Sequence, residues 1–258
     1  MDTLGVCTSR NVRTVSLVVT VIDDFTGQPV CGSNARVWIE NEKPPIKKTE
    51  GWNVFLNLSD GEYIVKASGG TYNQSECSCV VKTGKPAMLK IRLTPNSSYP
   101  IPSGTTCIEG TAELNALVRV YSSDKTAAFK LLSDVKKGGA EIGIYHTDGF
   151  EAEGKLFRII SPDKKEEFIR VSGTENKERS FYRLSEPLKN SYPKIGTLII
   201  PVNEAVADGE GKFFIPIRNT FKESCEYICM ATKSKEISVA AEIPSGRRTQ
   251  INLTENQN

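Results

Sequence analysis

The chain has 258 residues, with 33 basic and 31 acidic side chains and a formal net charge of +2. Without a surplus of lysine and arginine, the composition excludes a strong electrostatic case for nucleic-acid binding, which depends on replacing counterions along the phosphates. Hydrophobic residues at 38% and charged residues at 25% indicate an ordinary folded protein, and one histidine leaves little for histidine-based metal or catalytic chemistry.

An apolar segment near the N-terminus, residues 15–22, follows Arg10 and Arg13 and invites comparison with a signal peptide. It is short, contains Ser16 and Thr20, and has no small-residue cleavage site after it, so we interpret it as a β-strand. No run approaches the roughly 18 apolar residues of a membrane helix. We therefore expect cytoplasmic synthesis without a signal peptide, no membrane insertion, and seven cysteines kept as thiols.

Most of the chain alternates polar and apolar residues in short segments that end in Gly, Asn, Asp or Pro. This pattern predicts strands at 15–22, 35–40, 53–58, 62–67, 89–93, 117–121, 141–146, 155–160, 167–171, 198–202, 212–217, 227–232 and 237–241. Short strands with close turns predict an all-β chain of tandem antiparallel β-sandwich modules, immunoglobulin-like in kind. One short helix is expected within 125–137, where Phe129, Leu132 and Val135 have helical spacing before Gly138.

Three segments share an order of features: a Glu-Gly pair at Glu50, Glu153 or Glu210, an apolar strand, an aromatic strand and a closing strand. Joints rich in Pro, Ser and Asn follow the first two copies and are typical of linkers. The order predicts tandem modules, with an N-terminal arm at 1–13, module 1 at 14–95, a linker at 96–107, module 2 at 108–187 and a short module 3 at 188–258. The alternative of one or two larger sandwiches stays open, and the strand at 181–184 could close module 2 or open module 3.

The first module reads VTVIDDFTGQPVCGSNARVWIE from Val19 and TEGWNVFLNLSDGEYIVKASGG from Thr49. The Thr-Gly-Gln-Pro turn that follows Asp23 reverses the chain, and Gly61 permits a tight turn before Tyr63, whose ring is expected on the core face. With these features residues 14–95 resemble the carboxypeptidase regulatory-like, or transthyretin-like, β-sandwich domain, and the later repeats resemble it more faintly. The resemblance implies a noncatalytic spacer, adhesion or assembly module.

Residues that could carry catalysis or bind metal are scattered along the sequence. His146 ends a predicted strand with no nucleophile motif beside it, so we interpret it as a turn residue. Cys77 and Cys79 share one face of a strand, as do Cys225 and Cys229. Zinc sites more often use close cysteine pairs in turns, so we interpret the Cys77/Cys79 pair as small core packing plus one outward thiol. We therefore predict no enzymatic activity, no cofactor and no metal.

Four aromatic residues are the candidate partner-binding residues, because they lie on predicted strands near turns or in the linkers: Trp52, Tyr72, Tyr99 and Tyr192. The linker tyrosines have two interpretations. They could pack between modules and stiffen a rod, or they could contact a partner protein.

These observations predict a noncatalytic structural or interaction protein whose modules bind neighbouring protein subunits, including copies of itself, in a multi-protein assembly. One setting is a phage tail or phage-tail-like contractile particle, with the chain as cap, collar, baseplate or decoration of a virion or extracellular particle. The alternative is a surface adhesin or a carbohydrate- or ligand-binding module, which would need aromatic residues grouped in a groove.

Overall fold

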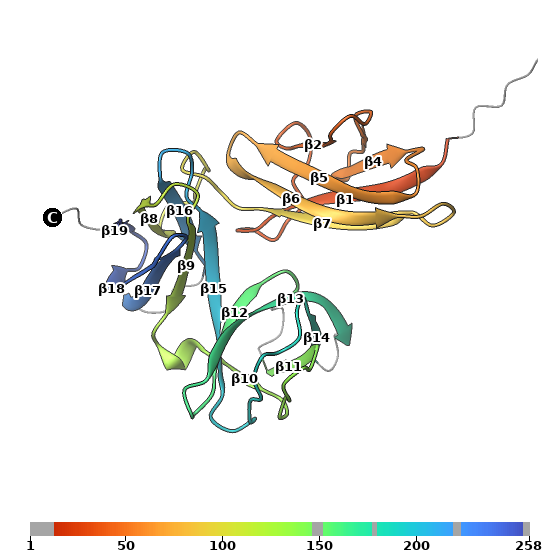
Figure 1. The fold of residues 1–258 in the computed structure, drawn as a ribbon. Helices are drawn as coiled ribbons and strands as arrows, with labels where there is room; N and C mark the ends of the chain where they lie inside the picture. The colour runs from red at the N-terminus through yellow and green to blue at the C-terminus, as the bar shows by residue number, and fades with distance from the viewer. Residues whose placement is uncertain (1–12, 146–151, 177–179, 219–222, 255–258) are drawn as a thin grey trace, which may run out of the picture. The chain divides into compact units, whose positions relative to one another are not determined.

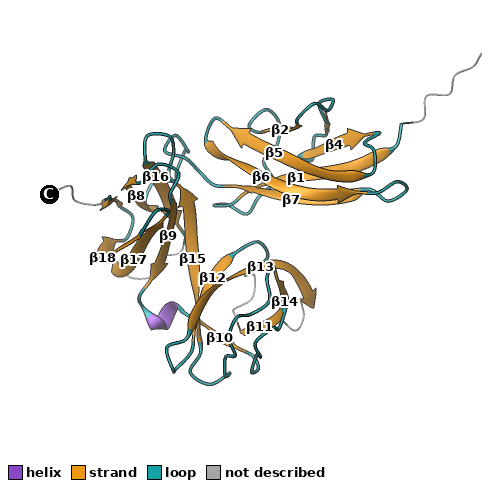
Figure 2. Ribbon diagram, viewed as in Figure 1, coloured by secondary structure: helices purple, strands orange, loops and turns teal. Residues whose placement is uncertain are grey.

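The computed structural model describes residues 13–145, 152–176, 180–218 and 223–254, and the chain divides into two compact units, 1–99 and 100–258. The regular structure is nearly all β (Figure 1). The only helix among the described residues is the short 3-10 turn η1 (Lys125–Ala127), drawn in purple in Figure 2. The prediction of an all-β chain with tandem sandwiches is therefore confirmed.

The first unit is a sandwich of two sheets (Figure 1). One sheet has the order β3 (Ile46–Lys47), β4 (Trp52–Leu56), β1 (Val15–Asp23) and β7 (Ala87–Leu93), and the other has the order β2 (Arg36–Ile39), β5 (Gly61–Gly69) and β6 (Tyr72–Val81). Strand β1 pairs antiparallel with β4 and parallel with β7. Its alternating sequence places Leu17, Val19 and Val21 in the core, where they are fully buried.

The second unit contains another sandwich with similar strand pairing. Its strands are β8 (Thr106–Ala112), β9 (Leu117–Ser122), β15 (Leu198–Val206), β16 (Lys212–Ile217), β17 (Ser224–Thr232), β18 (Glu236–Pro244) and β19 (Arg248–Leu253). Strand β8 pairs antiparallel with β16 and parallel with β19, as β1 does with β4 and β7. Strands β9, β17 and β18 are neighbours in the other sheet, as β2, β5 and β6 are. The two sandwiches differ in that β15 pairs with β9 in the second unit, whereas β3 pairs with β4 in the first.

The shared pairing of these strands explains why the segments after Glu50 and Glu210 look alike. Gly51 and Gly211 adopt positive φ angles of 85° and 78° in the turns that lead into β4 and β16. A positive φ strains any residue with a Cβ, so glycine is favoured at this point of both sandwiches. The first and third copies of the sequence repeat are therefore equivalent parts of two equivalent sandwiches.

A ring of strands is inserted in the second sandwich, between β9 and β15. It contains β10 (Phe129–Leu131), β11 (Glu141–Tyr145), β12 (Leu156–Ile160), β13 (Glu166–Asn176) and β14 (Phe181–Leu184). The order β10-β11-β14-β13-β12-β15 closes on itself, because β10 also pairs with β15. The first half of β15 belongs to this ring through β12, and its second half belongs to the sandwich through β9. The ring has its own core, which includes the fully buried Phe157 and Ile159.

The module boundaries predicted for the second half of the chain need correction. Strands β8 and β9 lie in the predicted module 2 (108–187), yet they pair with β16, β17 and β19 of the predicted module 3 (188–258). The sandwich that contains the predicted module 3 therefore begins with β8 and β9, which precede the inserted ring in the sequence. Among the described residues, the strands after Glu153 are successive antiparallel neighbours and none has a parallel partner, so the second copy of the repeat is only locally similar. The boundary between the two units follows Tyr99, inside the predicted linker 96–107.

The helix predicted within 125–137 is wrong. Only the short turn η1 forms, and Phe129 then opens strand β10, which pairs with β11 on one side and β15 on the other. Backbone pairing on both edges closes the ring and buries Leu131, which a helix at this place would not achieve.

Candidate functional site

Two of the predicted aromatic residues, Tyr72 and Tyr99, come together at a buried carboxylate in the first unit. The hydroxyl of Tyr72 donates to Asp23 Oδ2 at 3.1 Å, and the hydroxyl of Tyr99 donates to the same oxygen. The other oxygen, Oδ1, accepts the backbone N–H groups of Phe25 and Thr26 at 2.8 and 3.0 Å. Both carboxylate oxygens are thus satisfied within the fold, and the cluster ties the end of the unit to the turn after β1.

The environment of this cluster keeps both phenols protonated. Burial, followed by the charge of Asp23, raises the pKa of Tyr72 to about 12. Burial, followed by the hydrogen bond to Asp23, also raises the pKa of Tyr99. The rings of Tyr72 and Tyr99 meet edge to face at 5.5 Å. A catalytic tyrosine that acts as a base or nucleophile needs a lowered pKa. The pKa values of Tyr72 and Tyr99 are raised instead, so the two hydroxyls act as structural hydrogen-bond donors to Asp23.

Trp52 lies apart from this cluster, on the outer face of the sheet β3-β4-β1-β7, where 48% of its surface is exposed. Beside it a row of apolar side chains crosses the whole sheet, because strand register sets Ile46 opposite Val54, Val54 opposite Val18, and Val18 opposite Met88. We call these four residues the apolar row. Ile46 is 43% exposed and Met88 is 79% exposed. Val18 is half-buried and Val54 is buried, at 8% exposure, so the exposed apolar surface lies at the two ends of the row and at Trp52. Scattered exposed apolar residues are ordinary, but several on one sheet face with a tryptophan among them are typical of a contact surface.

The outer face of the other sheet, β2-β5-β6, carries a shorter apolar diagonal that the sequence reasoning missed. Trp38 faces outward from β2, Ile64 from β5 and Val80 from β6, and the last two are 55% and 58% exposed. The indole Nε1 of Trp38 donates to Glu40 Oε1 at 3.1 Å, and the guanidinium of Arg36 lies 5.4 Å from its ring centroid. The period-two alternation of 35–40 was the available signal, since it places Arg36 and Trp38 on the face opposite to Val37.

Tyr192 was predicted as a linker residue that packs between modules or contacts a partner, but it lies inside the ring. It is 1% exposed in the core of the ring, and its hydroxyl donates to Glu167 Oε1 at 2.9 Å. The backbone N–H groups of Lys189 and Asn190 also donate to Glu167. The segment around Tyr192 is folded against Val135 by paired backbone hydrogen bonds, so it forms part of the ring.

The cysteines pack mainly into the cores. Cys77 and Cys79 face the first core together, and burial raises the pKa of Cys79. Cys229 is buried in the core of the second sandwich, where burial raises its pKa to about 11, and Cys225 packs at the edge of that core. Within the described residues no group of His, Cys, Asp and Glu side chains is arranged to hold a metal ion. His146 lies outside the described residues.

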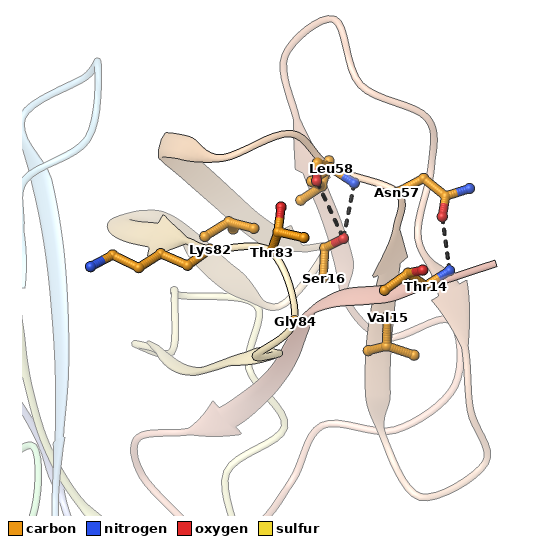
Figure 3. Close-up of a pocket in the computed structure, with 9 residues that line it drawn as sticks. Thr14, Val15, Ser16, Asn57, Leu58, Lys82, Thr83 and Gly84 are labelled. Carbon is orange, nitrogen blue, oxygen red and sulfur yellow. Dashed lines mark hydrogen bonds between the residues drawn. The ribbon is translucent and has the colours of Figure 1, made fainter. Parts of the chain in front are cut away.

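A small pocket of about 200 Å³ opens at one end of the first sandwich (Figure 3). Its polar groups are already engaged within the fold: Ser16 Oγ accepts from Leu58 N at 3.0 Å, and Asn57 Oδ1 accepts from Thr14 N at 2.8 Å. Thr83 bonds to the carboxylate of Asp60. The pocket therefore presents few free groups that could orient a ligand.

No helix in the described part of the chain is long and apolar enough to cross a membrane. No protein-family model matches the chain, and neither does any curated protein. Among solved structures, the Bacillus anthracis TIE protein is similar with 15% identity and a TM-score of 0.27, over 93% of this chain and 50% of that one. The chain thus spans about half the length of that protein.

Two further solved structures have similar scores. BcpA, the major pilin subunit of Bacillus cereus, has 11% identity and a TM-score of 0.25, over 90% of this chain and 69% of that one. A DUF3823 family protein from Bacteroides ovatus has 13% identity and a TM-score of 0.25, over 89% and 98%. Scores this low carry no argument about function, so the functional conclusion rests on the surfaces described above.

Proposed function

We propose that this chain is a noncatalytic structural protein whose β-modules bind neighbouring protein subunits in a larger assembly. The apolar row is the observation that carries the proposal. It spans all four strands of one sheet, and its end residues Ile46 and Met88 are 43% and 79% exposed. A protein surface that covered the row would remove roughly 25 cal/mol of unfavourable hydration free energy for each Å² buried.

The proposal extends the sequence resemblance. The parallel partner of β1 and the Asp23 turn belong to the segment, residues 14–95, that resembles the carboxypeptidase regulatory-like or transthyretin-like domain, and we propose that relationship for the first unit. We also retain synthesis in the cytoplasm as part of the proposal. In the described residues nothing favours a phage tail or contractile particle over another assembly, so the partner class is protein subunits and no particle is named.

The ligand-binding alternative finds less support. A carbohydrate site would need aromatic side chains grouped around a groove with free polar groups. The pocket in Figure 3 is lined by no aromatic residue, and the oxygens of Ser16 and Asn57 are already bonded.

The native mass of the chain in cell extract tests the proposal. We expect the chain to migrate in a particle well above its own 28.4 kDa. The double variant Ile46→Asp/Met88→Asp charges both ends of the apolar row and should shift the chain toward its free mass, because burying an unpaired carboxylate is costly. Gln74→Asp is the matched control on an exposed polar position of the same sandwich, and it should leave the particle intact. A wild-type chain found only as free monomer would contradict the proposed function.

A further inference from the structure

Strand β18 ends the strand order β15-β9-β17-β18 in the second unit, and no described strand pairs with its outer edge. At the other end of this sheet the ring closes on itself, so β18 remains as an end strand. The equivalent strand of the first sandwich, β6, is tied to the segment after β7 by hydrogen bonds from Asn73 N to Thr94 O and from Asn96 N to Thr71 O. Between the described residues of β18 and β19 the structure shows no such bond.

The hydrogen-bond phase of the β17–β18 hairpin fixes which backbone groups face the open edge. Ser245 N donates to Glu223 O at 2.8 Å, which marks these opposing residues as a hydrogen-bonded pair of the ladder. Hydrogen-bonded pairs alternate along an antiparallel ladder. The backbone N–H and C=O groups of the odd-numbered residues of 237–243 therefore bond to β17. The N–H and C=O groups of the even-numbered residues therefore point to the open edge. Pro244, which has no N–H, falls in this outward set, as expected for a proline in an edge strand.

The core-facing side chains of β18 are incompletely covered at this edge. Ile237, Val239 and Ala241 are only half-buried, whereas Ile243 is buried. Val239 and Ala241 pack against the core of the second sandwich from its margin. An additional strand at the edge would bond the outward backbone groups and cover these apolar side chains at the same time.

We propose that β18 pairs antiparallel with β18 of a second copy of this chain, about a twofold axis at Ala240. On the outer face this register sets Ala240 opposite its own copy and Glu242 opposite Ser238 of the second copy. On the core face it sets Val239 opposite Ala241 of the second copy. The two faces of β18 are thus complementary to themselves, as a twofold interface requires. This inference rests on the proposed function in one respect: it names the chain itself as one of the partners.

Charge is compatible with a second copy in this register and disfavours the register centred on Val239. Moving the axis to Val239 would place Glu236 opposite Glu242 of the second copy, and like charges that face each other across strands are destabilising. With the axis at Ala240, Glu236 lies opposite Pro244 instead. Strand β18 also lacks the lysine that commonly blocks an exposed edge, since its charged residues are Glu236 and Glu242 alone.

Sedimentation velocity of the purified full-length chain, from about 1 µM to about 500 µM, tests the pairing. The mass should rise with concentration from 28.4 kDa to about twice that value. Ala240→Lys sets like charges opposite each other at the axis, and should raise the dimer dissociation constant at least about tenfold. Ser238→Lys brings a cation opposite Glu242 of the second copy, and should leave the dimer as tight or tighter. Ser78→Lys, at the exposed position on β6, is the matched control and should change nothing.

Circular dichroism of each variant verifies that it retains the fold. A wild-type mass that stays at 28.4 kDa throughout, or equal dissociation constants for Ala240→Lys and Ser78→Lys, would overturn the pairing. A loss on Ser238→Lys as large as that on Ala240→Lys would overturn the Ala240-centred register. A monomer in pure solution that still enters a large particle in extract refutes the pairing and leaves the proposed function standing. A pure dimer that enters no larger particle supports the pairing and refutes the wider assembly.

Discussion

Replacing Tyr99 with phenylalanine is the sharpest test of the cluster around Asp23. The change removes one hydroxyl and keeps the ring, so the edge-to-face contacts with Phe25 at 6.0 Å and with Tyr72 at 5.5 Å should persist. What is lost is the hydrogen bond to Oδ2 of a buried carboxylate. That oxygen keeps the Tyr72 hydroxyl at 3.1 Å as its remaining side-chain donor.

The expected loss follows from the charge of the acceptor. A hydrogen bond to a charged group contributes about 1.5–3 kcal/mol to stability. Because Tyr72 still donates to Oδ2, we expect Tyr99→Phe to lower the free energy of unfolding by about 2 kcal/mol. For a unit of this size, 2 kcal/mol corresponds to a fall in melting temperature of about 8–16 °C. The double variant Tyr72→Phe/Tyr99→Phe leaves Oδ2 without either phenol, so its loss should exceed the sum of the single losses.

Both tryptophans of the chain, Trp38 and Trp52, lie in the first unit, so their fluorescence during urea unfolding reports on that unit selectively. The midpoint and slope of the transition give the free energy of unfolding. Tyr63→Phe is the matched control, because its hydroxyl donates to Ser59 O at 3.0 Å at an exposed site. We expect it to cost less than about 0.5 kcal/mol.

A loss below about 0.5 kcal/mol on Tyr99→Phe, or one equal to that of Tyr63→Phe, would refute the reasoning. It would mean that the Asp23 carboxylate does not depend on the phenol, and that the end of the first unit is held by its backbone bonds alone.

Three other predictions follow from the same geometry. The pKa of Tyr72 is raised to about 12 in the folded state, against about 10 in an unfolded chain. The stability of the first unit should therefore hold below pH 10 and fall as the pH rises toward 12. Tyr72→Phe should flatten this pH dependence when it is measured by urea titration. Gly110→Ala would place a Cβ 1.7 Å from Ile251 O across the β8–β19 pair, so circular dichroism should show a loss of at least about 2 kcal/mol in the second unit; an unchanged transition would contradict that close approach. Tyr192→Phe should cost about 1–2 kcal/mol, because Glu167 keeps its two backbone donors, and hydrogen exchange in the ring should rise; unchanged exchange would show that the hydroxyl contributes nothing.

The sequence predicted which side chains of a strand share one face. It did not predict which residues from elsewhere in the chain contact that face. The spacing of Cys77 and Cys79 placed them on one face, and both do face the first core. Tyr72 and Tyr99 looked like linker or turn residues, but their partner Asp23 is 49 and 76 residues away, so no local pattern could reveal it. Tyr192 was misplaced for the same reason, since Glu167 and Val135 reach it only through the closed ring.

By itself, the sequence determined most of the strands, the glycine turns before β4 and β16, and the near-balanced charge, because period-two alternation and positive-φ glycines are local properties of the chain. The tertiary structure alone decided which strand pairs with which. An alternating strand has two similar edges and no intrinsic partner, and β8 finds β19 across about 140 residues because the core between them must be closed. That closure assigned β8 and β9 to the last sandwich, turned the expected helix into a ring strand, and left the edge of β18 open.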